Sequence, residues 1–176
     1  EAGGHNGREE TTTLCLIPAV REATTLPLIA AGGIGTGEAI FALMALGAEG
    51  VQMGTRFALT DESSASDIFK EYCLRLNEGD TKLLLKKLAP TRLVTNSFRD
   101  RVEAAEGRGA SAEELRELLG RGRAKKGIFE GDLEEGELEI GQVAALFRRR
   151  QSVDEVMKEL LEGYRRASDK IRSAGL

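Results

Sequence analysis

A single histidine, His5, is the side chain best suited to acid–base chemistry in this sequence of 176 residues. It lies in the glycine-rich segment Gly3-Gly4-His5-Asn6-Gly7, which has the character of an irregular loop rather than of an apolar face. A neutral imidazole titrates near neutrality and suits the role of a general base at a carbon acid. A lone histidine is more often structural than catalytic, but its place in a glycine loop favours the catalytic interpretation.

Two further glycine loops, Ala31-Gly32-Gly33-Ile34-Gly35 and Met53-Gly54-Thr55, each follow a short apolar run. Glycine lets a ligand approach the backbone closely, and the exposed N–H groups, aided by the N-terminus of the next helix, can hold an anion. One such loop alone indicates a tight turn. Two of them on adjacent parallel strands predict a phosphate site like that at the last two strands of a (β/α)₈ barrel. The G-K-[ST] ending of a P-loop is missing, and Gly35-Thr36-Gly37 does not complete a dinucleotide fingerprint.

The elements that position these two loops are predicted to form a strand–helix–strand unit. Residues 26–31 and 50–53 are short apolar runs and predict the two strands. Thr36 can cap a helix over residues 36–46, and Gly47 can end it. Strands joined through a helix in this way are parallel, so both loops are expected at the same edge of the sheet.

The rest of the chain has the pattern of amphipathic helices. Nine Lys, Arg, Asp and Glu residues lie in residues 1–60, whereas 45 lie in residues 61–176. The first part is therefore expected to hold parallel strands buried on both faces, and the second part helices with solvated faces. Another helix is predicted over residues 12–23. S-x-x-E capping boxes begin at Ser111 and Ser152, and apolar spacing after Ser152 predicts a helix of about six turns.

Composition argues against several classes of function. The net charge of −4 and the lack of a basic block disfavour nucleic-acid binding. No apolar run approaches about 18 residues, so no membrane span is expected. No cluster of Cys, His and carboxylate residues has metal-ligand spacing, so no metal site is expected. Cys15 and Cys73 fit neither a CxxC pair nor a disulfide framework, and two reduced thiols fit the cytoplasm.

Several charged residues receive less specific interpretations. Arg56 directly follows Gly54-Thr55, so it either contacts a phosphate or forms an ion pair, and the sequence does not decide between these roles. The run Arg148-Arg149-Arg150 is expected to be a solvated connection before the last helix rather than an anion site. The acidic stretch from Glu130 to Glu139 is expected to lie at the surface.

Five segments carry a family signature, and they extend over nearly the whole chain. They are Glu1-Ala2-Gly3-Gly4-His5-Asn6-Gly7, Ile29-Ala30-Ala31-Gly32-Gly33-Ile34, Gly47-Ala48-Glu49-Gly50-Val51-Gln52-Met53-Gly54-Thr55-Arg56-Phe57, Arg92-Leu93-Val94-Thr95-Asn96-Ser97-Phe98, and Gly131-Asp132-Leu133-Glu134-Glu135-Gly136 with Gly141-Gln142. The first three resemble the nitronate monooxygenase family, in its order and spacing. The last two resemble its R-x-x-x-N-x-F element and its late G-D-x-x-x-G…G-Q segment. That family also contains flavin-dependent enoyl-ACP reductases.

The resemblance implies an α/β fold, namely the C-terminal part of a TIM-type (β/α)₈ barrel that binds FMN, with a smaller helical domain over the active site. Residues 1–60 would form the last two barrel strands. Residues 61–140 would form the helical substrate or lid domain, and residues 141–176 a return segment with the C-terminal amphipathic helix. By this interpretation Glu1 follows the sixth barrel strand, and the first six strands are not in the chain.

The resemblance also implies roles for single residues. His5 corresponds to the family's active-site histidine. Gly3 and Gly4 would lie near the flavin, and Gln142 would return toward it from the second domain. The family's phosphate-binding backbone corresponds to the two loops that the glycine pattern selects independently, here Ala31, Gly32, Gly33, Met53, Gly54 and Thr55.

The leading hypothesis is an FMN-dependent nitronate monooxygenase that oxidises alkyl nitronates and nitroalkanes with O₂. The alternative is an enoyl-ACP reductase that uses FMN and NAD(P)H on an enoyl thioester. The stretch Glu10-Thr11-Thr12-Thr13 slightly favours this alternative, because reductase members tend to carry a Thr pair there. A second alternative is a non-catalytic fragment that binds flavin or phosphate. The expected partner is a small-molecule substrate, not nucleic acid or a membrane, and a homodimer is possible.

Overall fold

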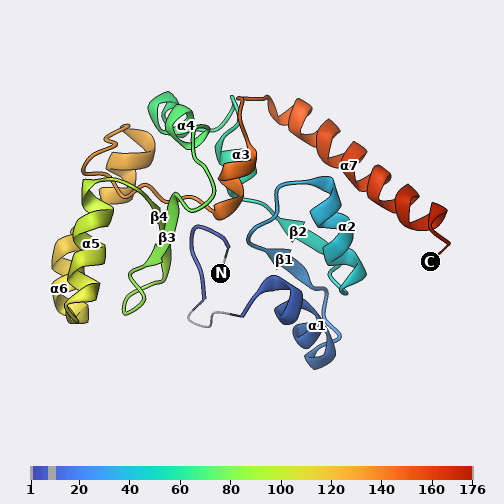
Figure 1. Ribbon diagram of the computed structural model, residues 1–176, viewed down its shortest axis with the longest axis horizontal. Coiled ribbons are helices and arrows are strands. Elements are labelled where there is room, and N and C mark those ends of the chain that lie inside the picture. The colour runs from blue at the N-terminus through green and yellow to red at the C-terminus, as the bar shows by residue number, and fades with distance from the viewer. Residues whose placement is uncertain (1, 8–10, 176) are drawn as a thin grey trace.

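The computed structural model describes residues 2–7 and 11–175, so Glu1 and Glu10 lie outside the described residues. Figure 1 shows an arc, with α1, β1, α2 and β2 at one end, β3, β4, α5 and α6 at the other, and the N-terminal segment between them. The elements are α1 (Thr13–Ala23), β1 (Ile29–Ala31), α2 (Gly37–Ala45), β2 (Gly50–Gln52), α3 (Thr55–Ala58), α4 (Asp67–Cys73), β3 (Thr81–Leu84), β4 (Thr91–Val94), α5 (Ser97–Gly107), α6 (Ala112–Leu119), the π-helix η1 (Lys125–Phe129), the 3₁₀-helix η2 (Gln142–Leu146) and α7 (Val153–Ser173).

The predicted strand–helix–strand unit is confirmed. Strands β1 and β2 are parallel and pair with Ala31 opposite Gln52. Helix α2 begins after Thr36, whose side-chain oxygen accepts a hydrogen bond from the backbone N–H of Ala39. Gly47 then adopts a φ of +104°, which glycine tolerates without a steric penalty, and the chain turns from the helix into β2.

The two strands are less buried than the sequence predicts. Ala30 is buried and packs with Ile17 of α1 and Leu43 of α2, but its neighbour Ile29 is 55% exposed. Successive side chains of a strand point to opposite faces. The expectation of burial on both faces is therefore wrong, because in the described residues this two-stranded sheet packs against helices on the side of Ala30.

The segment after α4 departs from the helical prediction. Strands β3 and β4 form an antiparallel hairpin, and all four residues of β4 are buried. Leu84 and Leu93 pack with Phe98 of α5 in an apolar cluster. Thr91 favours a strand because it is β-branched, and Pro90 cannot continue a helix. These local preferences, together with burial against α5, explain why this stretch is extended.

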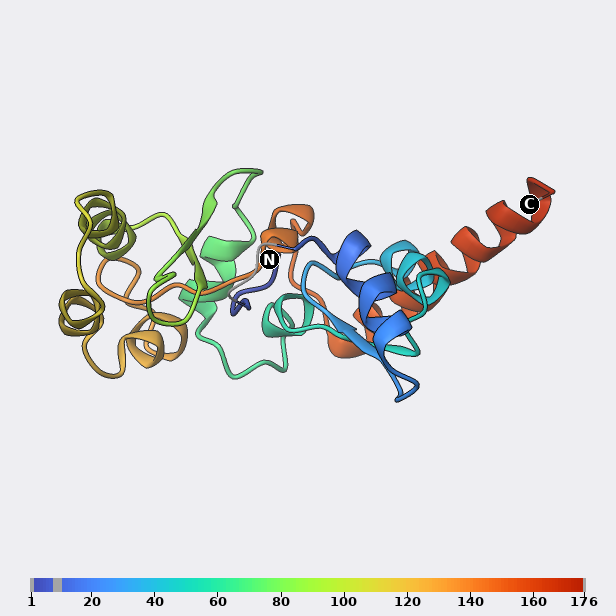
Figure 2. The same ribbon diagram turned by 90° about the horizontal axis from the view of Figure 1, so that it is seen from below.

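Both predicted capping boxes are confirmed. Ser111 and Ser152 each accept a hydrogen bond from the backbone N–H three residues later, where a glutamate carboxylate accepts from the serine N–H in return. Helix α7 buries Val156, Leu160 and Gly163, and Figure 2 shows its C-terminal half extending away from the other elements. None of the described helices, α7 included, combines the length and hydrophobicity needed to cross a membrane.

Glycines allow α7 to cross α2 closely. A Cβ atom added to Gly37 would lie 2.0 Å from a backbone carbonyl oxygen of α7, and one added to Gly163 would lie 2.7 Å from Oε2 of Glu38. Beside this crossing, the rings of Phe41 and Tyr164 meet edge to face with their centroids 5.5 Å apart. The crossing fixes α2, and with it the loop that connects the helix to β1.

Candidate active site

The glycine loops meet at a cavity of about 540 Å³. Because Ala31 pairs with Gln52, strands β1 and β2 end side by side, and the loops that follow them open on the same edge. The N-terminal segment and the segment that precedes η2 border the same cavity. Nine of the ten site residues expected from the sequence line it, namely Gly3, Gly4, His5, Ala31, Gly32, Gly33, Met53, Gly54 and Thr55.

The glycines at the strand ends expose bare backbone to this cavity. Gly32 and Gly33 have φ values of +95° and +71°, a region in which other residues are strained. A Cβ atom added to Gly33 would lie 2.8 Å from Cβ of Ala2, so this loop and the N-terminal segment are in close contact. Gly54 has a φ of −90°, and, apart from its chain neighbours, no atom of the described residues lies within 4 Å of the place that its Cβ would take. The strand ends therefore leave room for a ligand.

Thr55 joins the strand ends to the segment that returns toward the cavity. Its Oγ1 accepts a hydrogen bond of 3.0 Å from the backbone N–H of Gly141. The next N–H along, that of Gln142, donates to the carbonyl oxygen of Ala2 at 2.9 Å. Gln142 is exposed and is the one expected site residue that does not line the cavity. Its backbone, rather than its side-chain amide, is what the structure brings to the site.

Strand β4 holds the histidine loop through backbone hydrogen bonds. The N–H of Arg92 donates to the carbonyl oxygen of Gly4 at 2.7 Å, and the N–H of Asn6 donates to that of Pro90 at 2.9 Å. His5 lies between these two bonds and forms a bridge with β4. A loop without regular structure of its own is thus aligned along a buried strand.

The same strand holds the acidic segment that leads to Gly141. The N–H of Val94 donates to the carbonyl oxygen of Leu138 at 3.0 Å, and Leu93 forms an antiparallel bridge with Glu139. Because both segments are bound to β4, the side chains of His5 and Glu139 meet.

The meeting of these side chains is the main electrostatic feature of the cavity. Nδ1 of His5 contacts Oε1 of Glu139, with the side chains 70% and 17% exposed, respectively. Burial raises the pKa of the neighbouring Glu137, the charge of Glu139 raises it further, and His5 lowers it. The exposed imidazole thus contacts one partly buried carboxylate, that of Glu139, and this arrangement is suited to proton transfer.

Glu139 is a site residue that no pattern in the sequence singles out. The acidic stretch was expected at the surface, but Glu139 lines the cavity and contacts His5. The expectation is wrong for this residue because its burial comes from the pairing of its backbone with β4. No local pattern signals that contact, since the two residues are 134 positions apart.

Asn96 and the segment Gly131–Gly136 of the two late motifs meet each other rather than the cavity, whereas Gly141 lines the cavity. Asn96 accepts a hydrogen bond from a backbone N–H in the first turn of α5, and its amide group donates to the carbonyl oxygens of Leu133 and Gly136 at 2.9 and 2.8 Å. Asp132 accepts two backbone hydrogen bonds within the same loop. These contacts shape the loop that precedes Glu139, so the motif residues act as a scaffold for the site.

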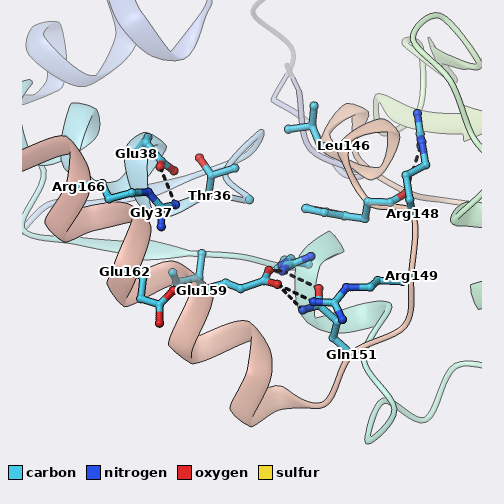
Figure 3. A pocket seen from close by; sticks show the side chains of 14 residues that line it. Thr36, Gly37, Glu38, Leu146, Arg148, Arg149, Gln151, Glu159, Glu162 and Arg166 are labelled. Carbon is cyan, nitrogen blue, oxygen red and sulfur yellow. Dashed lines mark hydrogen bonds and ion pairs between the residues drawn. The ribbon is translucent and has the colours of Figure 1, made fainter. Parts of the chain in front are cut away.

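A second cavity, of about 490 Å³, lies between α2, η2 and α7 (Figure 3). Arg56 is buried there, where it forms an ion pair with Glu159 and donates to Oε1 of Gln151 at 2.9 Å. Its guanidinium carbon lies 4.3 Å from the ring centroid of Phe147, and Arg149 also pairs with Glu159. Of the two interpretations of Arg56, the structure shows the ion pair. Three of the four arginines that line this cavity pair with its glutamates, and the fourth, Arg148, donates to backbone carbonyl oxygens, so the cavity is the weaker candidate for a ligand site.

The first turn of α2, at Gly37, lines the second cavity, whereas the first residue of α3, Thr55, lines the cavity of the glycine loops. The run Arg148-Arg149-Arg150 is an exposed connection before the last helix, as the sequence predicts, with Arg148 and Arg149 exposed and Arg150 half-buried. Arg148 also donates to the carbonyl oxygen of Leu76 at 2.8 Å, and Arg150 pairs with Asp61 at 3.0 Å. These bonds attach the start of α7 to the segments around α4.

Comparison with known proteins decides the family. The family described as nitronate monooxygenase matches residues 1–163. The chain belongs to the nitronate monooxygenase family. Among its relatives, a probable nitronate monooxygenase from Staphylococcus saprophyticus is 43% identical over 110 residues, which are 56% of this chain and 30% of the relative. The corresponding protein from Staphylococcus aureus strain JH9 is 37% identical over 118 residues, 61% of this chain and 33% of the relative.

Two solved structures show where this chain fits in the fold of nitronate monooxygenase relatives. FabK from Thermotoga maritima has a TM-score of 0.89 and 34% identity, over 98% of this chain and 54% of FabK. Nitroalkane oxidase from Streptomyces ansochromogenes has a TM-score of 0.73 and 29% identity, over 97% of this chain and 51% of the oxidase. The chain thus has the mixed α/β fold of these proteins and spans about half of their length. It spans about a third of the length of the curated relatives.

Proposed function

We propose that this chain is the C-terminal part of an FMN-dependent nitronate monooxygenase, which oxidises alkyl nitronates and nitroalkanes with O₂. The observation that carries the proposal is that His5 and the two glycine strand ends line one cavity, in a chain of this family. In this proposal β1 and β2 are the last two strands of a (β/α)₈ barrel within residues 1–60. Residues 61–140 form the substrate or lid domain, and residues 141–176 form the return segment and last helix.

The strand ends fit the phosphate group of FMN. Gly32 and Gly33 offer backbone without side chains in a conformation that glycine favours, and Gly54 adjoins open space. The Thr55 hydroxyl accepts one hydrogen bond and keeps its own proton to donate. When bound, FMN supplies electron transfer between the substrate and O₂. The other proposed flavin contacts are Gly3, Gly4, Ala31 and Met53, which line the same cavity.

His5 is the proposed catalytic base. Its Nδ1 faces Glu139, so Nε2 is the ring nitrogen left for the substrate, and the 70% exposed ring is accessible. With a neutral nitroalkane, Nε2 takes the proton from the α-carbon, the C–H bond breaks, and its electron pair remains on the nitronate. With a preformed nitronate no proton is removed, and His5 orients the substrate by a hydrogen bond to a nitro oxygen.

Oxygen consumption by the full-length, flavin-loaded enzyme tests this proposal with a nitroalkane and its nitronate as paired substrates. His5→Ala is expected to lower kcat with the nitroalkane by about 10²- to 10⁴-fold, the usual contribution of a general base, and to affect the nitronate less. An unchanged rate with the nitroalkane would refute the role of His5. Protein that folds but stays colourless with added FMN would instead support the non-catalytic interpretation.

The second candidate is a flavin-dependent enoyl-ACP reductase of the same family. The higher TM-score with FabK, 0.89 against 0.73 for nitroalkane oxidase, is the observation that favours it. In this case the same cavity holds the flavin, and an enoyl thioester replaces the nitronate. Loss of enoyl-thioester absorbance that depends on NADH, without O₂ uptake on nitronates, would decide for the reductase.

A further inference from the structure

We propose that Glu139 is a positioning residue for His5. The Glu139 carboxylate accepts a hydrogen bond from Nδ1–H and thereby fixes the tautomer in which Nε2 carries the lone pair that meets the substrate. The inference rests on the proposed function of His5 as the catalytic base. It adds a residue from a distant part of the chain to the acid–base machinery.

The contact between the two side chains is the first support. Nδ1 of His5 meets Oε1 of Glu139, and the carboxylate is 17% exposed where the imidazole is 70% exposed. An ionised carboxylate accepts hydrogen bonds and cannot donate them, while a neutral imidazole has one donor and one acceptor nitrogen. The nitrogen that meets Glu139 must therefore be the donor, and Nε2 is left as the acceptor.

The second support is that β4 holds the backbones of both residues. Gly4 and Asn6 hydrogen-bond to β4 on either side of His5, and Glu139 forms a bridge with Leu93 of the same strand. Both side chains thus leave segments whose backbones are fixed on one buried strand. A pair held in this way keeps its orientation without the entropy cost of aligning two free loops.

The third support is the absence of a side chain at Gly4. A Cβ atom at this position would lie 2.6 Å from Oε1 of Glu139. The φ of Gly4 is outside the left-handed region, so its backbone conformation alone does not require glycine. The space beside Gly4 is instead occupied by the carboxylate that meets His5.

The Glu139 carboxylate would assist His5 during proton transfer. When Nε2 takes a proton from the substrate, the ring becomes an imidazolium and the adjacent carboxylate stabilises its charge. The same carboxylate holds the ring plane, so Nε2 stays directed as the proton moves. Loss of the carboxylate should therefore lower the rate of proton transfer more than the affinity for substrate.

The test uses the full-length, flavin-loaded enzyme, three variants of acidic residues and two variants of His5. Glu139→Ala removes the acceptor, and Glu139→Gln keeps an oxygen acceptor without the charge. Glu130→Ala is the matched control in the same acidic stretch. Among the described contacts, the side chain of Glu130 pairs only with the exposed Lys125. Long-range ¹H–¹⁵N spectra of histidine-labelled protein report the tautomer, with the His5 signal assigned by its loss in His5→Gln. Oxygen uptake with a nitroalkane gives kcat and KM.

We expect the wild type, Glu139→Gln and Glu130→Ala to show the Nδ1–H tautomer of His5, and Glu139→Ala to show a mixture with Nε2–H. For Glu139→Ala, kcat should fall by about 10- to 100-fold, the range that the partners of an oriented imidazole contribute elsewhere, with KM within about twofold. Retention of a single Nδ1–H tautomer and wild-type kcat by Glu139→Ala, while His5→Ala is inactive, would refute the positioning role and leave the proposed function intact. Full activity of His5→Ala would instead refute the role of His5 as the catalytic base, on which this inference rests.

Discussion

Nδ1 of His5 contacts Oε1 of Glu139, although 134 positions separate the two residues in the chain. The contact arises because β4 holds the backbones of both segments. It lies at the cavity where β1 and β2 end in glycine loops. An acid–base group and a backbone suited to a phosphate are therefore brought to one cavity, as the proposed flavin chemistry needs.

Glu137→Gln should stabilise the protein at neutral pH. Burial, followed by the charge of Glu139, raises the pKa of Glu137 in the folded state above its ordinary value of 4.5. Between the unfolded and folded pKa values the folded state binds more protons, so stability falls as pH rises through this window. Glutamine carries no such penalty. Urea unfolding at several pH values should show the variant more stable at pH 7 and equal to the wild type near pH 4, and a variant less stable at pH 7 would contradict this.

Asp132→Asn should destabilise the protein at pH 7 and lose this effect in acid. Hydrogen bonds from the backbone N–H of Glu135 and from Lys126 lower the pKa of Asp132 to about 2. A lowered pKa contributes stability above the unfolded value of 3.8, and this contribution disappears as pH falls from about 4 to 2. Urea unfolding across this range tests it, with the exposed Glu78→Gln as a control for net charge. A constant difference between variant and wild type at all pH values would argue against the assignment.

Gly37→Ala should lower the free energy of unfolding by about 1–3 kcal/mol, as overpacking does. The new methyl group would lie 2.0 Å from the carbonyl oxygen of Leu160 and force α7 away from α2. Gly107→Ala is the matched control, because no atom of the described residues, apart from its own helix backbone and chain neighbours, lies within 4 Å of the new Cβ at the end of α5. The control should gain about 0.5–1 kcal/mol from the helix preference of alanine. Equal stabilities of the two variants would contradict the close crossing.

Cys73 should resist alkylation in the native protein. Its side chain is fully buried, and burial raises its pKa to about 12, so very little thiolate is present or accessible near neutrality. Cys15 on α1 is exposed in this structure and provides the internal comparison. Mass spectrometry of peptides after iodoacetamide treatment should find label at Cys73 only when denaturant is added. Rapid native labelling of Cys73 would show that the core around α4 is open.

Local signals account for the parts of the fold that the sequence predicts. The strand–helix–strand unit is defined by a strand that ends in glycine, a capping Thr36 and a helix stop at Gly47. All of these signals lie within residues 26–53. The capping boxes at Ser111 and Ser152 have the same local character, and the structure confirms each. The family resemblance then adds the expected place of His5.

Contacts between distant segments account for what the sequence does not predict. No local sequence signal distinguishes Glu139 from its acidic neighbours. Its position at the cavity depends on the pairing of its backbone with β4. The hairpin β3–β4 has no regular alternation, since all four residues of β4 are buried between neighbouring segments. Arg56 had two plausible partners, and the choice of Glu159 depends on where α7 returns. Each of these outcomes is decided by tertiary packing.

The central claim is that the ends of β1 and β2 hold the flavin phosphate. The binding of FMN to the Gly54→Leu variant tests this claim most directly. The leucine would enter open space at the cavity with no backbone strain, so the fold should be retained. Gly107→Leu, which also enters open space but lies outside the cavity, is the control. Flavin fluorescence titration of the full-length apoprotein should give a Kd at least about tenfold higher for Gly54→Leu, a loss of about 1.4 kcal/mol, and a wild-type Kd for Gly107→Leu. A wild-type Kd for Gly54→Leu would contradict the account.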